Sequence, residues 1–254
     1  MFSLEVECDP DDRDLLIAEL WEHGSAGMVE LSVSSVRAFF EDEANRSELL
    51  RLFPGARARV EERCDWVQSA RDLLQPMAVG ERFFLAPFWR DDPTPAGRFR
   101  ITVNPGMAFG TGVHETTQLC LEALEEYLTP GMSVLDVGTG SGILAEGARL
   151  LGAGLVYACD TDPVAVKIAG NGFVGSVDAV AGASADLVVA NISPEAVMHL
   201  APEMLRVLRR PGGVILASGF ESQEVDLVRA RFPPAQEIRG KGNWALVVVS
   251  PASV

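Results

Sequence analysis

The sequence has little of what several common protein classes require. Its four cysteines (Cys8, Cys64, Cys120 and Cys159) are scattered over 254 residues without a C-x-x-C pair, which argues against a disulfide framework and for reduced thiols in a cytoplasmic protein. The three histidines lack the spacing of metal ligands, so no metal site is expected. No apolar run approaches the ~20 residues that cross a bilayer. The N-terminal residues do not show the basic and then apolar pattern of a secretion signal, so none is expected.

Positive charge is also scarce. The chain has 21 lysines and arginines against 36 aspartates and glutamates, a formal net charge of −15. An acidic surface repels nucleic-acid backbones and anionic membranes, so neither is expected as a direct partner. The same surface suits a basic protein partner, although an ordinary acidic bias without any such partner explains the charge equally well.

The order of hydrophobic patterns divides the chain into two domains and a connector. Residues 1–60 alternate between strand and helix periods in the order βαββαβ, which is typical of a small ferredoxin-like α+β domain. Residues 61–96 are interrupted by prolines and are expected to form a connector. Residues 97–254 alternate strand and helix. This alternation predicts an α/β fold with a doubly wound, mostly parallel sheet, whose ligands bind at the carboxyl ends of the strands.

The stretch V-L-D-V-G-T-G-S-G, residues 134–142, is the most informative in the chain. Its apolar start predicts a buried parallel strand, and its glycines, which include Gly138 and Gly140, predict a tight turn into a helix starting near Ile143. Glycines let the backbone of such a turn approach a ligand closely, and the first N–H groups of the helix favour a carboxylate or phosphate. Asp160 ends the next strand, where a carboxylate can bind both ribose hydroxyls. The unit therefore predicts a nucleoside-cofactor site.

The spacing of the glycines distinguishes between cofactors. A dinucleotide fingerprint, G-x-G-x-x-G, needs a glycine where this chain has Ile143, so an NAD-dependent oxidoreductase is disfavoured. The pattern D-x-G-x-G-x-G, which begins at Asp136, instead resembles the first motif of class I S-adenosylmethionine-dependent methyltransferases, whose fold is Rossmann-like. When this motif is taken alone, a glycine-rich turn without any ligand is the alternative.

Two further stretches of the second domain carry chemistry-bearing residues. Residues 104–117, N-P-G-M-A-F-G-T-G-V-H-E-T-T, predict a loop rich in glycine and hydroxyl groups that enters a helix at Glu115 or Thr116. By itself, His114 is more typical of a capping or surface residue than of a catalyst. Residues 186–191, D-L-V-V-A-N, predict a strand that brings Asn191 to the carboxyl edge of the sheet.

Together these segments resemble the PrmA-type methyltransferases, which modify lysines of ribosomal protein L11. The likeness extends over nearly the whole chain. Residues 65–89 resemble the linker of that family, residues 105–117 its distinctive loop, and residues 188–192, V-V-A-N-I, its substrate-edge strand. The resemblance implies that residues 1–60 recognise the ribosomal protein. It also implies that residues 97–254 bind S-adenosylmethionine and methylate lysine amino groups of that protein, in the cytoplasm.

The same resemblance implies roles for individual residues. Thr116 would contact the methionine part of the cofactor, and the turn at Gly138 and Gly140 would lie against its carboxyl region. Asp160 would bind the ribose. Asn191 would face the cofactor and the reacting amine, which makes it the expected catalytic residue.

One segment departs from the family. Between Asp162 and Asp186 the chain is shorter than in the family and leaves room only for a clipped helix and a weak third strand. Either residues have been lost there, or the sequence omits a loop. Residues 171–178, N-G-F-V-G-S-V-D, keep part of the strand, with Ser176 or Asp178 as the expected contact to the adenine.

Two other functions remain open from the sequence. The chain is a related methyltransferase if another protein or a small-molecule amine is the acceptor. It is a cofactor-binding scaffold if the shortened segment has abolished turnover. Cofactor titration combined with an assay of methyl transfer to the ribosomal protein distinguishes the three hypotheses.

Overall fold

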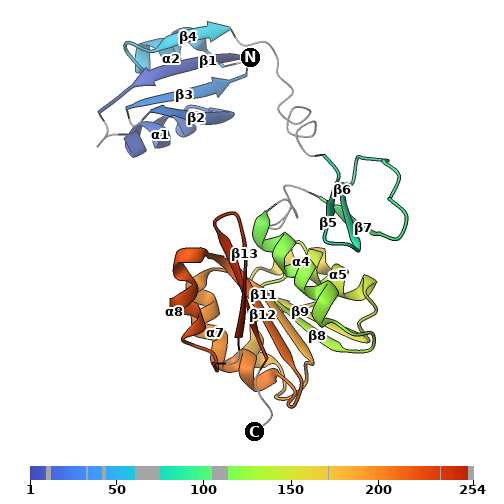
Figure 1. Ribbon diagram of the computed structural model, residues 1–254. Coiled ribbons are helices and arrows are strands. Elements are labelled where there is room, and N and C mark those ends of the chain that lie inside the picture. The colour runs from blue at the N-terminus through green and yellow to red at the C-terminus, as the bar shows by residue number, and fades with distance from the viewer. Residues whose placement is uncertain are drawn as a thin grey trace. The chain divides into compact units, whose positions relative to one another are not determined.

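The computed structural model describes residues 1–9, 13–32, 34–41, 44–60, 75–104, 114–170, 172–234 and 236–250 (Figure 1). By its internal contacts the chain divides into two compact units, Met1–Leu74 and Gln75–Val254. No helix within the described ranges is long and apolar enough to cross a membrane.

The first unit is a four-stranded antiparallel sheet with two helices. Its elements are β1 (Phe2–Glu7), α1 (Arg13–Glu22), β2 (Gly27–Ser32), β3 (Ser35–Phe40), α2 (Arg46–Leu52) and β4 (Arg57–Val60). The strands lie in the order β2-β3-β1-β4. Alternate residues of β3, namely Val36, Ala38 and Phe40, are fully buried, as the period of two predicts. The expected ferredoxin-like arrangement is confirmed.

The second unit is organised around a seven-stranded sheet in the order β10-β9-β8-β11-β12-β14-β13. Every pair from β10 to β12 is parallel, whereas β14 runs antiparallel to both of its neighbours. The prediction of an α/β fold with a mostly parallel sheet is therefore confirmed. The strands are β8 (Ser133–Val137), β9 (Leu155–Asp160), β10 (Gly172–Val174), β11 (Leu187–Asn191), β12 (Val214–Glu221), β13 (Gln236–Lys241) and β14 (Trp244–Val249).

Helices cover both faces of this sheet (Figure 1). On one face lie α4 (Glu115–Tyr127) and α5 (Ile143–Leu150), and on the other lie α7 (Pro194–Val207) and α8 (Val225–Arg229). Neighbouring residues of β11 point to opposite faces of the sheet. Val189 packs in the apolar cluster with α4 and α5, and Val188 packs in the apolar cluster with α7 and α8. Burial on both faces explains why the central strands are continuous apolar runs.

The shortened segment is compact in the structure. Helix α6 (Pro163–Ala169) has two turns, begins at the predicted N-cap Asp162, and is followed by the three-residue β10. The side chain of Asp162 accepts the N–H of Val164 at 2.8 Å. A single 3-10 turn, η2 (Val177–Ala179), stands between β10 and β11 where a doubly wound sheet usually has a crossover helix.

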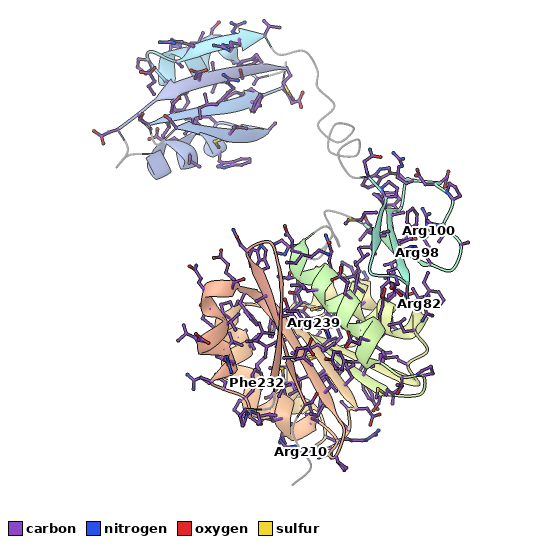
Figure 2. The ribbon with its side chains drawn as sticks, viewed as in Figure 1. Arg82, Arg98, Arg100, Arg210, Phe232 and Arg239 are labelled. Atoms are coloured by element: carbon purple, nitrogen blue, oxygen red, sulfur yellow. The ribbon has the colours of Figure 1, made fainter. Side chains whose placement is uncertain are left out.

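Residues 75–104 form a second, three-stranded sheet within the second unit. Its strands are β5 (Met77–Val79), β6 (Phe83–Pro87) and β7 (Phe99–Val103), and Phe83 and Ile101 lie in the core beneath α4. The Glu125 carboxylate accepts the N–H groups of Glu81 and Arg82 at 2.8 Å each, while Arg98 donates to the carbonyl of Phe83 at 2.8 Å. Figure 2 labels Arg82, Arg98 and Arg100 on this sheet.

The structure thus differs from the expected connector of residues 61–96. Residues 75–96 belong by their contacts to the second unit, and residues 61–74 lie outside the described residues. Strands β6 and β7 pair in parallel and are joined by an irregular, proline-containing segment, residues 88–98. The sequence therefore does not reveal that the two strands pair. Parallel pairing leaves no hairpin signal.

The turn between β8 and α5 is held by the buried carboxylate of Asp136. Helix α5 starts after Gly142, which adopts φ +78° and supplies no side-chain cap. A Cβ at this position would lie 2.9 Å from the backbone of Ala169, so only glycine fits. Asp136 takes over as the cap: its Oδ2 accepts the N–H of Ala145 at 3.1 Å and the hydroxyl of Thr139 at 2.7 Å.

The same burial perturbs the carboxyl group. Asp136 is completely buried, and desolvation raises its pKa to about 6, against the hydrogen bonds from Thr139 and Ala145 that favour the anion. Within the described residues, Oδ1 of Asp136 has no hydrogen-bond partner. The anion is therefore only partly compensated, and the proton is held more tightly in the folded than in the unfolded state.

We predict that the second unit folds on its own. A chain of residues 75–254 keeps all residues of the seven-stranded sheet and of its two apolar clusters, so it should show one cooperative thermal transition by circular dichroism. Its midpoint should lie within a few degrees of the corresponding transition of the full chain. A broad, non-cooperative loss of signal would contradict this prediction.

Asp136 should make stability fall with rising pH. Its folded-state pKa is raised to about 6, so the folded protein holds more protons than the unfolded chain between about pH 4 and pH 6. The free energy of unfolding should decrease through that window by roughly 3 kcal/mol at most. In Asp136→Asn this component is absent. Urea denaturation at pH 4.5 and 7.5 should therefore show the variant gaining stability relative to wild type at the higher pH, whereas an equal difference at both pH values would refute the assignment.

Candidate functional site

A cavity of about 490 Å³ lies at the carboxyl edge of the sheet. It begins at the ends of β9 and β10, passes the glycine turn after β8, and continues to the ends of β11 and β12. The N-termini of α4 and α7 and the first residue of β14 complete its walls. Its size lies within the range of pockets that enclose a small organic ligand.

Six of the residues expected from the sequence to bind the cofactor or the amine line this cavity: Thr116, Gly138, Gly140, Asp160, Ser176 and Asn191. The chain separates them widely, but the fold brings all six to one edge. Asp178 is not among the lining residues, since it lies on η2 and is exposed. Of the predicted loop 105–117, residues 105–113 lie outside the described residues.

Asp160 is fixed at the end of β9 by the backbone around it. Its Oδ2 accepts the N–H of Gly140 at 2.9 Å, and its Oδ1 accepts the N–H of Asp162 at 3.0 Å. Each carboxylate oxygen retains a second lone pair for a ligand. The half-buried carboxylate is therefore oriented in advance and remains able to accept hydroxyl groups at the cavity wall.

The start of α4 forms the opposite wall. His114 is the N-cap, and its Nδ1 accepts the N–H of Thr116 at 3.4 Å and lies 2.8 Å from the hydroxyl of the same residue. The imidazole packs edge-on against the indole of Trp244, with ring centroids 4.4 Å apart. The capping role expected for His114 is confirmed, and the ring also lines the cavity.

Asn191 ends β11 beside a bulge in the neighbouring strand. Its Nδ2 donates to the hydroxyl of Thr117 at 3.3 Å, which leaves the amide oxygen as an acceptor. In β12, Gly219 adopts φ +101°, and a Cβ there would lie 2.1 Å from the carbonyl oxygen of Ile192. A glycine is therefore required for β12 to pass this close to the residue that follows Asn191.

The other side chains near the cavity bear on which kinds of catalysis the site can support. Burial raises the pKa of the Cys159 thiol to about 12, so the thiol stays protonated and is no nucleophile. Among the described residues, no group of three or more His, Cys, Asp or Glu side chains is placed to hold a metal ion. The site therefore offers hydrogen-bond acceptors and apolar walls for binding and alignment.

Several lining residues have no counterpart in the sequence-based prediction. Trp244 begins a strand that the sequence does predict, but nothing local indicates that its ring faces a cavity. The apolar lining of α7 is equally hidden, because Ala196 and Leu200 fit an ordinary helix. Thr117 could have been predicted, because it directly follows Thr116 at the start of the same helix. The lining residues that sequence reasoning did not single out include Thr117, Ile143, Leu144, Ala196, Leu200, Gly219 and Trp244.

Comparison with known proteins places this fold and site. The profile of the family "Ribosomal protein L11 methyltransferase (PrmA)" matches residues 31–249. A ribosomal protein L11 methyltransferase of Pelotomaculum thermopropionicum is 43% identical over 196 residues, which cover 71% of this chain and 63% of that protein. One of Symbiobacterium thermophilum is 45% identical over 175 residues, 65% of this chain and 57% of the relative. The chain thus spans less than two thirds of the length of these two relatives.

Other relatives match over nearly their whole length. The ribosomal protein L11 methyltransferase of Pelobacter propionicus is 33% identical, with 98% of each chain covered. That alignment runs over 306 positions, more than the 254 residues here, so it contains gaps in this chain. The crystal structure of a ribosomal protein L11 methylase from Lactobacillus delbrueckii subsp. bulgaricus superposes with a TM-score of 0.64 and 27% identity. It covers 70% of this chain and 99% of its own. The chain belongs to the ribosomal protein L11 methyltransferase (PrmA) family.

Proposed function

We propose that this protein transfers methyl groups from S-adenosylmethionine to lysine amino groups of ribosomal protein L11. The observation that carries the proposal is the juxtaposition, in one cavity, of a glycine turn with Asp160 and of the strand-end Asn191. The family membership supplies the reaction and the acceptor, and the cavity supplies a place for both reactants.

The residues of the cavity fit an adenosyl amino acid. The turn at Gly138 has no side chain to fill the space above the end of β8, and a Cβ would lie 2.2 Å from Cγ2 of Ile192. Asp160 offers fixed acceptors for two neighbouring hydroxyls. Apolar side chains such as Leu144 and Leu200 line the cavity and suit the flat, weakly polar base.

The polar groups at the start of α4 suit the amino-acid end of such a ligand. Thr116 is buried and lies in the first turn of the helix, where N–H groups and the helix dipole favour a carboxylate. We assign Thr116 to the methionine part, Gly138 and Gly140 to the backbone approach, and Asp160 to the ribose. Ser176 lines the cavity beside β10 and stands as the adenine contact, while Asp178 is retained only as the weaker alternative.

For the reaction itself the protein needs to align and desolvate rather than to activate. When bound, S-adenosylmethionine supplies a methyl group already activated on sulfur: a C–N bond forms, the C–S bond breaks, and the amine nitrogen loses one proton to solvent. Asn191 is suited to the amine because its NH₂ end is engaged by Thr117, so its oxygen accepts an N–H and aims the nitrogen lone pair. Alignment of this kind lowers the barrier by up to ~7–11 kcal/mol in intramolecular models.

We assign substrate recognition to the first unit. Family resemblance supports this assignment, and none of the described residues of 1–60 lines the cavity. The net charge of −15 favours a basic partner of this kind. A cytoplasmic location, where ribosomal proteins are made, agrees with the unpaired cysteines that the structure describes.

The proposed function is tested by mass spectrometry of purified ribosomal protein L11 after incubation with enzyme and S-adenosylmethionine. Mass increases that correspond to one or more added methyl groups are expected on lysine-containing peptides. Cofactor binding by calorimetry without any mass increase would identify another acceptor or a scaffold without turnover. Residues 75–254 alone should bind the cofactor but methylate L11 poorly.

Asp160→Ala should weaken cofactor binding. The change removes the acceptor for the ribose hydroxyls, so the affinity for S-adenosylhomocysteine should fall by about 1.5–3 kcal/mol, the range for hydrogen bonds to charged groups. Asp160→Asn keeps one oxygen acceptor and should lose less. Calorimetry on both variants, after a thermal melt confirms folding, measures the effect. Unchanged affinity in a folded Asp160→Ala protein would place the ribose elsewhere.

Asn191→Ala should slow methyl transfer without weakening cofactor binding. A contact that matters most when the amine is aligned should lower kcat and kcat/KM together, by about a hundredfold. Thr117→Val removes the hydroxyl that engages Asn191 Nδ2 and should produce a smaller loss of the same kind. Single-turnover rates at saturating cofactor measure both. Wild-type rates in folded Asn191→Ala would remove the residue from the mechanism.

A further inference from the structure

We propose that Trp244 is a specificity-determining residue of this site, which holds the hydrocarbon chain of the acceptor amine against its indole with His114 as the supporting ring. The inference rests on the proposed function and names the part of the cavity that admits the lysine side chain. No sequence motif marks Trp244, whose ring is brought to the cavity only by the fold.

The sheet order divides the cavity into two halves. Asp160, Gly175 and Ser176 follow β9 and β10 at one end of the row of strands, and Asn191, Gly219 and Trp244 lie on β11, β12 and β14 toward the other. The hydroxyl-binding carboxylate and the glycine turn occupy the first half. The second half is therefore left for the acceptor, and Asn191 stands at the boundary between the two.

Trp244 reaches this edge because β14 runs antiparallel to β12. Its partner in the register is Glu221, the last residue of β12. The first residue of β14 thus lies level with the carboxyl ends of the parallel strands. Trp244 is only half-buried and lines the cavity together with His114, so a face of the indole remains available to a ligand.

The chemistry of the two rings suits an alkyl amine. A lysine side chain is a four-carbon apolar stem with a cationic end, and an indole attracts both through its large apolar face and its negative π surface. The His114 ring is held at 67° to the indole, with a centroid distance of 4.4 Å. The Nδ1 of His114 is engaged in capping α4, so the imidazole is held in place beside the indole.

A row of charged and polar contacts links α4 to β13, the strand that precedes Trp244. Lys241, three residues earlier and across the hairpin turn, contacts Glu122 of α4 at 2.6 Å. Arg239, labelled in Figure 2, contacts Glu126 at 2.8 Å. Tyr127 adds a hydrogen bond to Glu237 at 2.6 Å, and the guanidinium of Arg239 lies 5.2 Å from the Tyr127 ring centroid.

These contacts can form together because the spacing of the acidic residues along α4 matches the spacing of the basic residues along β13. Four residues of a helix advance ~6 Å, and two residues of a strand advance ~6.6 Å. Glu122 and Glu126 on α4 can therefore pair with Lys241 and Arg239 on β13 without strain. The backbone pairing of β14 with β12 and β13 sets the register that places Trp244 beside His114, and both ion pairs are compatible with that register.

The test uses a bisubstrate analogue, an adenosyl amino acid in which a nitrogen atom replaces the sulfur and carries a butylamino group through an ethylene linker, so that the amine nitrogen lies next to the position of the transferable methyl group and the butyl chain extends away from it. Calorimetry compares its dissociation constant with that of S-adenosylhomocysteine, which lacks the arm. In wild type the arm should increase affinity. In Trp244→Leu the gain in affinity from the arm should be about tenfold smaller than in wild type. The affinity for S-adenosylhomocysteine should stay within about twofold of wild type.

Companion variants separate a direct role from a structural one. Trp244→Phe should retain most of the gain because an aromatic face remains. His114→Asn keeps a capping side chain and should lose part of the gain. Phe88→Leu is the matched control: Phe88 also packs edge-on against a tryptophan, with its ring centroid 5.0 Å from that of Trp89, but it lies outside the cavity. It should leave both affinities unchanged.

The outcomes distinguish this inference from the proposed function. The inference is overturned if folded Trp244→Leu keeps the whole gain, or if it loses affinity for both ligands equally. Methyl transfer to L11 by wild type, followed by mass spectrometry, tests the proposed function independently. A wild-type enzyme that methylates L11, together with an unaffected Trp244→Leu, would defeat the inference alone. In kinetics, Trp244→Leu should raise KM for L11 more than it lowers kcat.

Discussion

The buried carboxylate of Asp136 is the constraint on which the site depends. A tight turn between a buried strand and a helix leaves the first N–H groups of the helix without partners, and Gly142 has no side chain to supply one. Asp136 closes the turn from inside through Thr139 and Ala145, and Asp160 closes it from the cavity side through Gly140. The glycine turn is held between two carboxylates. One is buried and partly uncompensated, and the other is exposed to ligand.

The rest of the site follows from the order of the strands. A parallel sheet brings the ends of β8, β9, β10 and β11 to one edge, and the reversal at β14 adds the start of that strand to the same edge. Helix α4 then links the parts. Its first turn lines the cavity, and its acidic second half holds both the hairpin of β13 and β14 and the turn before β6. Cavity and framework are thus stabilised by the same helix.

Features that depend only on neighbouring residues, such as caps, strand ends and turns, could be predicted from the sequence. The cap at Asp162, the strand ending in Asn191 and the turn after β8 follow from neighbouring residues, and the structure confirms each of them. The pairing of β6 with β7 was not foreseen, because a parallel pair has no turn signal. The strand β13 was not foreseen either, because its sequence Q-E-I-R-G-K is mostly polar. The contact between Trp244 and His114 depends on the register of that strand. The roles given to all the predicted site residues remain predictions: Thr116, Gly138, Gly140, Asp160, Ser176, Asp178 and Asn191.

The central claim is that the cavity has a cofactor half at β8 to β10 and an acceptor half at β11 to β14. The most direct measurement is a crystal structure of the protein with bound S-adenosylhomocysteine. The account predicts the ribose hydroxyls on the carboxylate of Asp160 and the sulfur atom directed toward Asn191, with the space beside Trp244 open. A nucleoside lying against Trp244, or a ribose without contact to Asp160, would contradict it.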